Sequence, residues 1–585
     1  MLHENYLKVL YIDLSAQKVR VARREDLYPY LGGAGAATVL LSETIDYRKG
    51  VFDPGQPIVF AIGPLSTIFP AVTKAVAMFR SPLTGNLGES HAGGRIALAL
   101  RYAGYDALVI TGRAAQPTYL YLDSNEVRFK PAQTLWGLGA EETGRLLRDI
   151  EPGRGHRSIM RIGPAGENLV RYANVNIETY RHFGRLGLGA ALGAKKLKGI
   201  YISGDADVAI QNFPEYNKVY AQVYKRVTET SLMEKYHDLG TPENVLPLNA
   251  LGALPTRNFQ QGQFEAAEAI SGEAFAQYDL MRKLSCSGCP IGCIHIALLR
   301  HQFGKGYEFE SSFVSYDYEL IYALGSFLGI GDRAGILHLI HRLDDQGLDA
   351  IATGITLGWA TEAMQKGLIA SGELGAKLAF GEVEGYLRAI DVIATGSSEL
   401  ARALAEGAQT AAGRYGGREF AAFLGGNAAA GYHTGYANIL GQMVGARHSH
   451  LDNAGYAIDQ KAGELSDEEI VQGLIREEEE RCVLTSLCVC LFARKVYDRP
   501  TSRAALKSIG IAVTDGDLDR LGQDIYRRKV WIKKRCGFDY SSLRAPGRLL
   551  ETPSMRGALT AERLDGLVRL FNRELEKSEV PGGAA

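Results

Sequence analysis

Apolar and polar positions alternate over short stretches in the first third of the chain, a pattern that predicts β-strands. Residues 7–14 and 18–22 flank a polar turn at 15–17, which is typical of a hairpin. Further short apolar segments that we expect to be strands lie at 57–62, 107–110, 119–122, 127–129 and 199–202. We therefore expect residues 1–205 to form a β-rich domain.

From Phe213 onwards the apolar positions recur at helical spacing, as in Tyr216-Asn-Lys-Val-Tyr-Ala-Gln-Val-Tyr224. A chain of 585 residues divides into about three or four domains when each holds about 100–200 residues. We predict an α+β protein in which the β-rich domain is followed by two mainly α-helical domains, at residues 206–410 and 411–585. One face of the last helix is expected to carry Leu564, Leu567, Leu570, Phe571 and Leu575.

The charge balance excludes some classes of protein. The chain has 65 basic and 66 acidic residues, and a net charge of −1 argues against a nucleic-acid binder, which needs a basic surplus. The longest uncharged stretch, 420–446, contains Asn427, His433 and Gln442 and is too polar for a membrane span, so we interpret it as buried lining. The N-terminus shows no signal peptide, and we expect a cytoplasmic protein without a membrane segment.

Seven cysteines are present, and none lies in the first 285 residues. Cys286, Cys289 and Cys293 have the spacing Cys-x2-Cys-x3-Cys, and the intervening glycines and proline allow tight turns that bring three thiolates to one centre. Such a soft site suits an iron–sulfur cluster or zinc, although buried inert cysteines remain an alternative. A fourth ligand must come from far away, and the downstream cysteines that can supply it are Cys482, Cys488 and Cys490.

Glycine is abundant, with 68 residues, and several glycine motifs carry an arginine or a lysine nearby. Backbone N–H groups that can approach closely, together with a cation, suit a phosphate-bearing ligand. Each motif alone is equally compatible with tight turns and close helix packing, and none has the spacing of a dinucleotide fold or a P-loop. Five of them in one domain favour a large phosphate-bearing ligand.

Taken in order, these motifs resemble the aldehyde ferredoxin oxidoreductases, which are tungsten or molybdenum bispterin enzymes. The resemblance extends over nearly the whole chain. It rests on Leu31-Gly-Gly-Ala-Gly35, Ser81-Pro-Leu-Thr-Gly85, Ala103-Gly-Tyr-Asp-Ala107, Gly163-Pro-Ala-Gly-Glu-Asn168, Gly184-Arg-Leu-Gly-Leu-Gly189 and the cysteine triplet with Cys490.

The resemblance implies a two-sheet pterin-binding domain at the N-terminus and a metal held by the dithiolenes of two pterins, without protein ligands. It implies a [4Fe–4S] cluster ligated by Cys286, Cys289, Cys293 and Cys490, which passes electrons to ferredoxin or a small ferredoxin-like subunit. It is also compatible with Mg²⁺ bridging the pterin phosphates and with a homodimer.

The resemblance also assigns pterin contacts. The sequence departs from the family pattern at Lys74, where arginine is usual, at His91, where asparagine is common, and in Thr485-Ser-Leu-Cys-Val-Cys490, where Thr485 replaces an aspartate. A lysine cannot form the bidentate contacts of arginine. The full set of implied cofactor-binding residues is Lys74, His91, Gly93, Arg185, Gly187, Gly189, Asp344, Gly347, Leu348, Asp349, Thr485 and Val489.

Two residues are expected to carry the chemistry. Glu319 resembles the acidic residue of the family, and a buried carboxylate of raised pKa would steer the proton of the attacking water. His448 matches a family histidine that would hydrogen-bond the carbonyl oxygen, and His450 is close enough in sequence to share this role. We interpret His338 and His341 as packing residues, although their spacing on a helix would also allow an iron site.

The predicted function is therefore oxidation of an aldehyde to a carboxylic acid, with electrons passing from tungsten or molybdenum through the cluster to ferredoxin. One alternative is a bispterin enzyme that acts on another substrate as the catalytic subunit of a larger electron-transfer complex. The other is a zinc-stapled protein without enzymatic activity.

Overall fold

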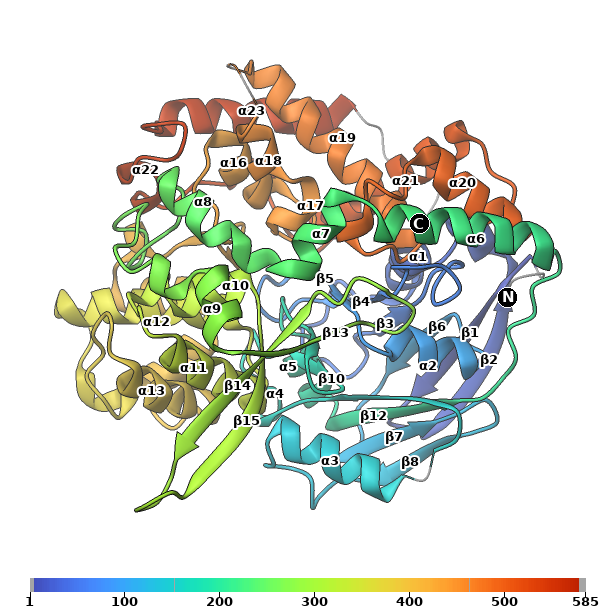
Figure 1. Ribbon diagram of the computed structural model, residues 1–585, viewed down its shortest axis with the longest axis horizontal. Helices are drawn as coiled ribbons and strands as arrows, with labels where there is room; N and C mark the ends of the chain where they lie inside the picture. The colour runs from blue at the N-terminus through green and yellow to red at the C-terminus, as the bar shows by residue number, and fades with distance from the viewer. Residues whose placement is uncertain (1–4, 152, 462, 464, 578–585) are drawn as a thin grey trace.

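In the part of the chain that the structure describes, two six-stranded sheets form the N-terminal region (Figure 1). The computed structural model describes residues 5–577 apart from 152, 462 and 464. The first sheet contains β1 (Leu7–Asp13), β2 (Lys18–Arg24), β3 (Ile58–Ala61), β4 (Ala75–Arg80), β5 (Leu87–Ala92) and β6 (Ala107–Thr111), in the order β2-β1-β6-β3-β4-β5. The second contains β7 (Thr118–Leu122), β8 (Val127–Pro131), β9 (His156–Arg161), β10 (Val175–Ile177), β11 (Arg181–Phe183) and β12 (Leu197–Gly204), in the order β11-β10-β9-β12-β7-β8.

The two sheets share a hydrophobic core. Leu10 and Ile12 of β1 and Phe60 of β3 lie in one buried cluster with Met160 and Ile200 of the second sheet. Because successive side chains of a strand point to opposite faces, Val9 belongs to the other, larger core. The central strands of the first sheet are therefore buried on both faces, which explains why β3 is a continuous apolar run, whereas the edge strand β2 is largely exposed.

Five helices are interspersed with these strands: α1 (Gly33–Thr44), α2 (Ile96–Tyr102), α3 (Ala140–Ile150), α4 (Pro164–Glu167) and α5 (Leu188–Ala194). The apolar spacing did not predict α1, because its residues from Gly33 to Leu41 are all buried and form no amphipathic stripe. The predicted hairpin is present as β1 and β2, and the other predicted strands correspond to β3, β6, β7, β8 and β12.

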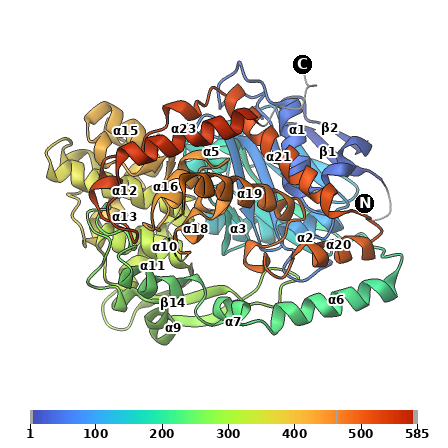
Figure 2. The same ribbon diagram turned by 90° about the horizontal axis from the view of Figure 1, so that it is seen from above.

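The rest of the described chain is mainly helical, which confirms the predicted fold class. The first group of helices is α6 (Phe213–Thr228), α7 (Ser231–Asp238), α8 (Val245–Ala250), α9 (Gly272–Tyr278), α10 (Tyr318–Leu324), α11 (Arg333–Gln346), α12 (Ala350–Gln365), α13 (Val383–Thr395), α14 (Glu399–Ala405) and α15 (Ala408–Tyr415). The second is α16 (Tyr436–Val444), α17 (His450–Asn453), α18 (Gly455–Asp459), α19 (Asp467–Ser486), α20 (Arg499–Ser508), α21 (Asp515–Arg535), α22 (Arg548–Glu551) and α23 (Ala561–Lys577). Figure 2 shows α19 and α21 beside α1, on which both helices pack.

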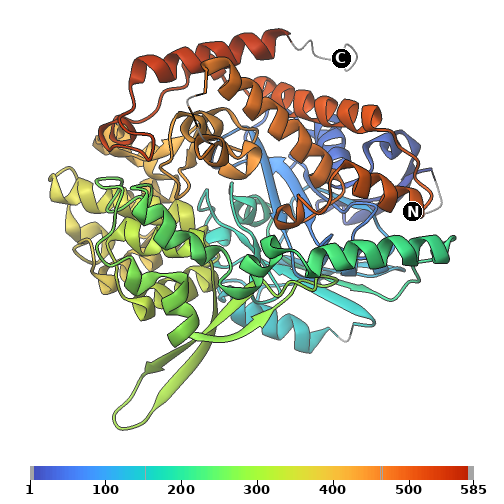
Figure 3. The same cartoon turned by 45° about the horizontal axis from the view of Figure 1, so that its top comes forward.

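A three-stranded sheet interrupts the helices, in the order β13 (Leu280–Leu284), β14 (Ile294–Gln302) and β15 (Phe309–Tyr316). The distal half of the β14–β15 hairpin projects from the body of the molecule (Figures 1 and 3). The sequence pattern did not predict this sheet, because Ile294, His295, Ile296 and Ala297 are all buried and so show no polar alternation.

The uncharged stretch 420–446 contains the short strands β16 (Phe423–Leu424) and β17 (Asn427–Ala428) and helix α16, and nearly all of it is buried, as predicted. Among the described residues, no single helix is both long and apolar enough to cross a membrane. Only Tyr318–Leu328 together with Arg333–Gln346, a pair bent by 115°, would pass on length and composition.

Candidate active site

One residue joins the cysteine triplet to the distant Cys490. Ala71, whose φ of +60° turns the chain, donates its N–H to the carbonyl of Gly288 at 3.3 Å. Its own carbonyl accepts the N–H of Cys490 at 3.0 Å. The triplet loop is also fixed to the first sheet, since Ser287 N–H donates to Gly94 O at 3.0 Å. The structure therefore brings Cys490 to the loop that carries the other three cysteines.

The charges around these sulfurs suit bound thiolates. Burial alone would raise the pKa of Cys286, but Arg181 and Lys74 outweigh it, so the pKa is lowered. Burial raises the pKa of Cys289 to about 12 and that of Cys293 to about 11, and negative charge on Cys490 adds to both shifts. Thiols that oppose each other's ionisation in this way lose their protons together only when a metal centre balances the charge.

Within the described residues, no group of three or more His, Cys, Asp or Glu side chains is arranged to hold a single metal ion. The remaining cysteines behave as buried neutral thiols, because burial raises the pKa of Cys482 and Cys488 to about 12 and also raises that of Cys536.

Gly93 lies directly against the cysteine loop. A Cβ atom at this position would be 2.6 Å from Cys286 Sγ and 3.4 Å from Lys74 Nζ. The absence of a side chain at Gly93 therefore makes room for the cysteine sulfur. The residue was expected to be close to a pterin, and the structure places it between the first sheet and the cysteine loop.

On the other side of the site, Arg185 is held by the uncharged stretch. Its Nη2 donates to Asn427 Oδ1 at 2.9 Å and to Ala428 O at 2.5 Å, and its Nε is 3.6 Å from Asp349 Oδ2. Asp349 also caps α12, because its Oδ1 accepts the N–H of Ile351 at 3.0 Å. Burial raises the pKa of Asp349, although the charge of Arg185 opposes this shift.

The segment from Asp344 to Asp349 lies against the strand-like residues 172–176 of the N-terminal domain. Asn174 N–H donates to Gly347 O at 2.9 Å, its side chain donates to Leu348 O at 2.8 Å, and Asp349 N–H donates to Tyr172 O at 3.1 Å. His182 Nε2 is 3.1 Å from Asp344 Oδ1. The predicted stretch thus joins two domains beside Arg185.

Several buried polar atoms in this region have no hydrogen-bond partner among the described residues. They are Arg181 Nε, Arg185 Nη1, Asn174 Oδ1, Asn176 Oδ1 and Asp349 Oδ2. Such groups are costly unless a ligand satisfies them. Two guanidinium donors with amide and carboxylate acceptors match the phosphates and the ring N–H groups of a pterin, so the residues present fit the expected cofactor.

The other expected pterin contacts have partners within the protein. His91 Nε2 is 2.7 Å from Glu89 Oε1, and Glu89 Oε2 is 2.6 Å from Lys529 Nζ. Burial lowers the pKa of His91 to about 4, so its imidazole is neutral. Thr485 donates its hydroxyl to Arg481 O at 2.7 Å within α19, and this bond turns the hydroxyl back on its own helix.

Three further expected contacts are packed by the chain itself. At Gly187 and Gly189 a side chain would collide with the backbone of Arg171 and Asn174, so both glycines allow α5 to approach that segment. Val489 is buried in the core, and its N–H donates to Leu484 O at 3.0 Å. Close packing accounts for these three positions.

Glu319 faces His450 rather than His448. Glu319 lies in the first turn of α10, and its Oε1 is 3.0 Å from Nε2 of His450, the first residue of α17. Burial alone would raise the pKa of Glu319, but His450 and Arg185 outweigh it, so the pKa is lowered. The expectation of a raised pKa is therefore corrected: this carboxylate is ionised.

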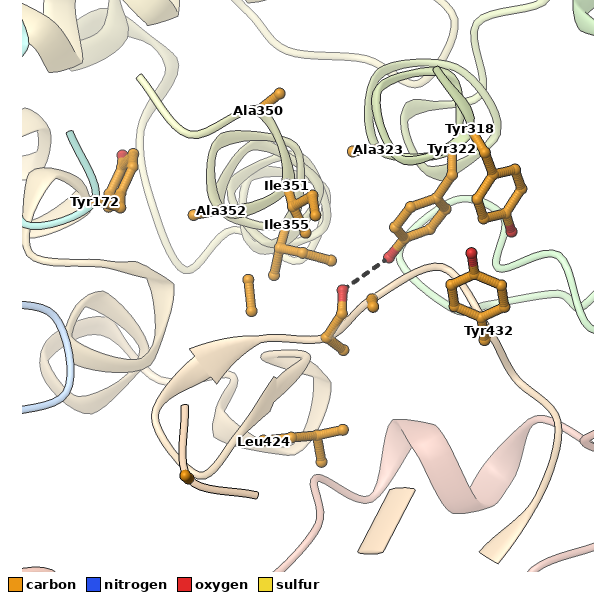
Figure 4. Packing of buried hydrophobic residues seen from close by; sticks show 14 of the residues in the cluster. Tyr172, Tyr318, Tyr322, Ala323, Ala350, Ile351, Ala352, Ile355, Leu424 and Tyr432 are labelled. Carbon is orange, nitrogen blue, oxygen red and sulfur yellow. Dashed lines mark hydrogen bonds between the residues drawn. The ribbon is translucent and has the colours of Figure 1, made fainter. Parts of the chain in front are cut away.

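Aromatic rings surround this pair. The Tyr432 ring centroid is 5.0 Å from that of His450 and 5.1 Å from that of Tyr318, the neighbour of Glu319. Figure 4 shows Tyr318 and Tyr322 of α10 opposite Tyr432, with Tyr322 Oη donating to Ala429 O at 3.3 Å. The sequence analysis did not single out these tyrosines, although Tyr318 is adjacent to the predicted carboxylate.

Both ring nitrogens of His448 are within hydrogen-bond distance of other protein groups. Nδ1 is 2.9 Å from Met443 O, and Nε2 is 3.0 Å from Nζ of Lys533, a buried lysine on α21. Burial and the charge of Lys533 keep the pKa of His448 well below its usual value. His448 therefore has no nitrogen free for a substrate oxygen, and the geometry favours His450 for that role.

Arg181 connects the two parts of the site. Burial would lower its pKa, but negative charge on Cys286, Cys293 and Asp317 outweighs this and raises it. The guanidinium thus lies near both the cysteine sulfurs and the residue that caps the helix of Glu319. Sequence reasoning missed Arg181, and the signal available was its position shortly before the glycine motif that contains Arg185.

His338 and His341 lie away from this site, in a cavity of about 390 Å³ that also contains His301 and Glu384. His341 Nε2 is 3.3 Å from Glu141 Oε2, a contact with α3 that suits the packing interpretation.

Comparison with known proteins gives the same family across the chain. The family models described as "Aldehyde ferredoxin oxidoreductase, N-terminal domain" and "Aldehyde ferredoxin oxidoreductase, domains 2 & 3" match residues 9–204 and 218–577. A "Tungsten-containing aldehyde ferredoxin oxidoreductase" of Pyrococcus abyssi is 31% identical over 579 residues, which cover 94% of this chain and 92% of that protein.

Other similar proteins have names that describe different functions. The "Aliphatic sulfonate oxidoreductase, WOR-like subunit" of Pyrococcus furiosus is 29% identical over a region that covers 69% of this chain and 66% of that protein. A chain of the solved "Active site complex BamBC of Benzoyl Coenzyme A reductase in complex with 1,5 Dienoyl-CoA" has a TM-score of 0.79 at 18% identity, covering 99% of this chain and 100% of that one. This second likeness shows a shared fold.

Proposed function

This chain belongs to the aldehyde ferredoxin oxidoreductase family, and we propose that it oxidises an aldehyde and water to a carboxylic acid. The reaction releases two electrons and two protons. When bound, a tungsten bispterin would supply the acceptor for the electron pair, and a [4Fe–4S] cluster would relay single electrons to ferredoxin or a small ferredoxin-like subunit. The observation that carries the proposal is the juxtaposition of the four cysteines, Arg181 and the Glu319–His450 pair.

The chain's own residues would bind and orient the reactants. Arg181 and Arg185 would hold the pterin phosphates, with Mg²⁺ as a further counter-charge, while Asp349, with Asp344 beside it, would accept ring N–H groups. Cys286, Cys289, Cys293 and Cys490 would ligate the cluster.

Glu319 and His450 would handle the proton. An ionised carboxylate in a buried aromatic site is suited to accept a proton from the attacking water, and His450 Nε2 at 3.0 Å orients that carboxylate. The other ring nitrogen, His450 Nδ1, has no hydrogen-bond partner among the described residues and would bind the carbonyl oxygen. His448, with both nitrogens engaged, would support the position of α17 through Lys533. We also propose that the enzyme acts in the cytoplasm.

The test combines metal analysis with an aldehyde panel and viologen dye under anaerobic conditions. One tungsten and four irons per chain are expected, together with aldehyde oxidation. E319Q should lower kcat by about 10²–10⁴-fold, the usual contribution of a general base. E308Q, at an exposed glutamate of the hairpin turn, is the control. Zinc without tungsten, or equal activity of the two variants, would contradict the proposal.

A second candidate substrate class follows from the sulfonate oxidoreductase relative. An aliphatic sulfonate should therefore be included in the panel, as a test of a catalytic subunit that uses a non-aldehyde substrate. Activity with sulfonates alone would favour that alternative. The variants H450Q and H448Q should both be assayed with whichever substrate is oxidised faster, to show which histidine takes part in catalysis. We expect kcat to fall in H450Q only.

A further inference from the structure

Exposed apolar side chains gather on one small part of this molecule. Among the described residues, fifteen large hydrophobic side chains are strongly exposed, and seven of them fall between Tyr278 and Phe313. This segment contains the cysteine triplet and the projecting β14–β15 hairpin (Figure 3). Contiguous exposed apolar patches mark interaction sites, so what matters is which of these side chains share one face.

The strand register shows which residues share a face. Leu298 is opposite Phe313, Arg300 is opposite Ser311, and Gln302 is opposite Phe309. Opposed residues of an antiparallel pair point to the same side, so these six form one face, which we call the outer hairpin face. Leu298, Phe309 and Phe313 remain 38%, 36% and 42% exposed on it.

The other side of the hairpin is already occupied. Leu299 and Val314, which alternate with the outer residues, are buried where β14 and β15 pack on α11. On the outer hairpin face, by contrast, Leu298, Phe309 and Phe313 stay exposed in the described structure, so the distal part of this side is not covered by another element.

The outer face is continuous with the cysteine loop. Ile294 and Ile296 lie on the same side of β14, and they are buried with Cys286 in one cluster. Strand β14 begins directly after Cys293. Since a strand rises about 3.3 Å per residue, Leu298 lies about 16 Å along the chain from that cysteine.

Charge on this face has one sign. The guanidinium of Arg300 is 4.1 Å from the centroid of the Phe309 ring, and that of Arg282 on β13 is 5.0 Å from the Phe313 ring. None of the six residues of the face is acidic, since Glu310 is opposite His301 and lies on the other side. The cavity beside Ser311 and Phe313 is lined by residues of both signs, among them Glu142, Arg145 and Arg148. A second copy of the chain placed face to face would bring like charges together, whereas an acidic partner would neutralise them.

We propose that the outer hairpin face, with Arg282, is the docking surface for an acidic iron–sulfur electron carrier. The inference rests on the proposed function, since it needs a reduced cluster at the four cysteines. Each electron leaves that cluster for an oxidised carrier, so one aldehyde reduces two one-electron carriers. The apolar centre would exclude water, and the two arginines would pair with carboxylates around the carrier's own cluster.

The experiment uses the holoenzyme and the double variant R282E/R300E. The matched control is R48E, which reverses an arginine whose side chain is 90% exposed in the first domain. Binding of an oxidised acidic ferredoxin to each immobilised protein is measured over a range of salt concentrations, and aldehyde-dependent reduction of ferredoxin and of benzyl viologen is followed in parallel.

R282E/R300E should weaken ferredoxin binding and raise the KM for ferredoxin at least tenfold, with a flatter salt dependence, while viologen reduction and metal content stay as in R48E. The neutral variant R282Q/R300Q should be intermediate. Unchanged ferredoxin binding in the double variant would overturn the inference, as would a change of oligomeric state with normal ferredoxin kinetics. Failure of the proposed function is distinct, because the wild-type protein would then lack viologen activity.

Discussion

The variant Gly93→Ala tests the arrangement around Cys286 most directly. The φ angle of Gly93 is not in the left-handed region, so alanine introduces no backbone strain. The new Cβ would be 2.6 Å from Cys286 Sγ and 3.4 Å from Lys74 Nζ. Since heavy atoms pack best at about 3.5–4.0 Å, the sulfur would have to retreat by about 1 Å.

The expected magnitude follows from overpacking. An extra methyl group in a tightly packed site costs about 1–3 kcal/mol. Distances between a metal and its ligands vary by only about 0.2 Å. A displaced sulfur would therefore weaken binding of the cluster and leave the stability of the fold largely unchanged. At 1.4 kcal/mol per factor of ten, cluster retention should weaken by about 5- to 150-fold.

The assay measures iron and acid-labile sulfide per chain after a timed exposure to chelator. Gly50→Ala is the control, because a Cβ there meets no atom within 4 Å and Gly50 does not have a left-handed φ. G93A should lose iron faster than G50A, and the two should have similar melting temperatures. Equal retention of iron would refute the placement of Gly93 against a cluster ligand.

Three further outcomes are expected. Cys490→Ser should remove the cluster and its broad visible absorbance, whereas Cys536→Ser should leave both intact; equal spectra would break the ligand assignment. Burial lowers the pKa of Lys533 from 10.5 to about 7 in the folded protein. Between these two pH values Lys533 is therefore protonated in the unfolded chain but mostly neutral in the folded one. The difference in melting temperature between the wild type and K533M should therefore shift in favour of the wild type as the pH rises from 7 to 10. A difference that stays constant over this range would contradict the prediction. Arg548→Ala removes the cation 2.7 Å from the buried Glu362 and leaves only the half-exposed Lys366, at 3.7 Å, as its counter-charge. This variant should destabilise the fold by about 3 kcal/mol in calorimetry, while a change below about 1 kcal/mol would show that the pair matters little.

The choice between His448 and His450 shows where sequence reasoning stopped. The two histidines are separated by one residue; His448 was matched to the family histidine, and His450 was expected only to be able to share its role. His448 has a φ of +54°, and Ser449 caps the helix that His450 begins. These backbone angles send one ring toward Lys533 and the other toward Glu319, and nothing in the spacing of the motif encodes them.

Sequence reasoning could likewise predict only one part of the cysteine site. The spacing of the triplet and its glycines was sufficient to predict three convergent sulfurs, because those contacts are local. The choice of Cys490 over Cys482 and Cys488 came from the family resemblance. In the structure it depends on Ala71, whose N–H and carbonyl connect Gly288 to Cys490.

The sequence by itself determined the features that depend on neighbouring residues. These are the first hairpin, the amphipathic helices, the triplet and the ordered motifs of the family. Only the tertiary structure decided which buried groups meet: Arg181 between the sulfurs and Asp317, His450 opposite Glu319, and a projecting sheet with an exposed outer face. Such contacts join residues far apart in the chain, and their energy depends on burial and distance, neither of which the order of residues contains.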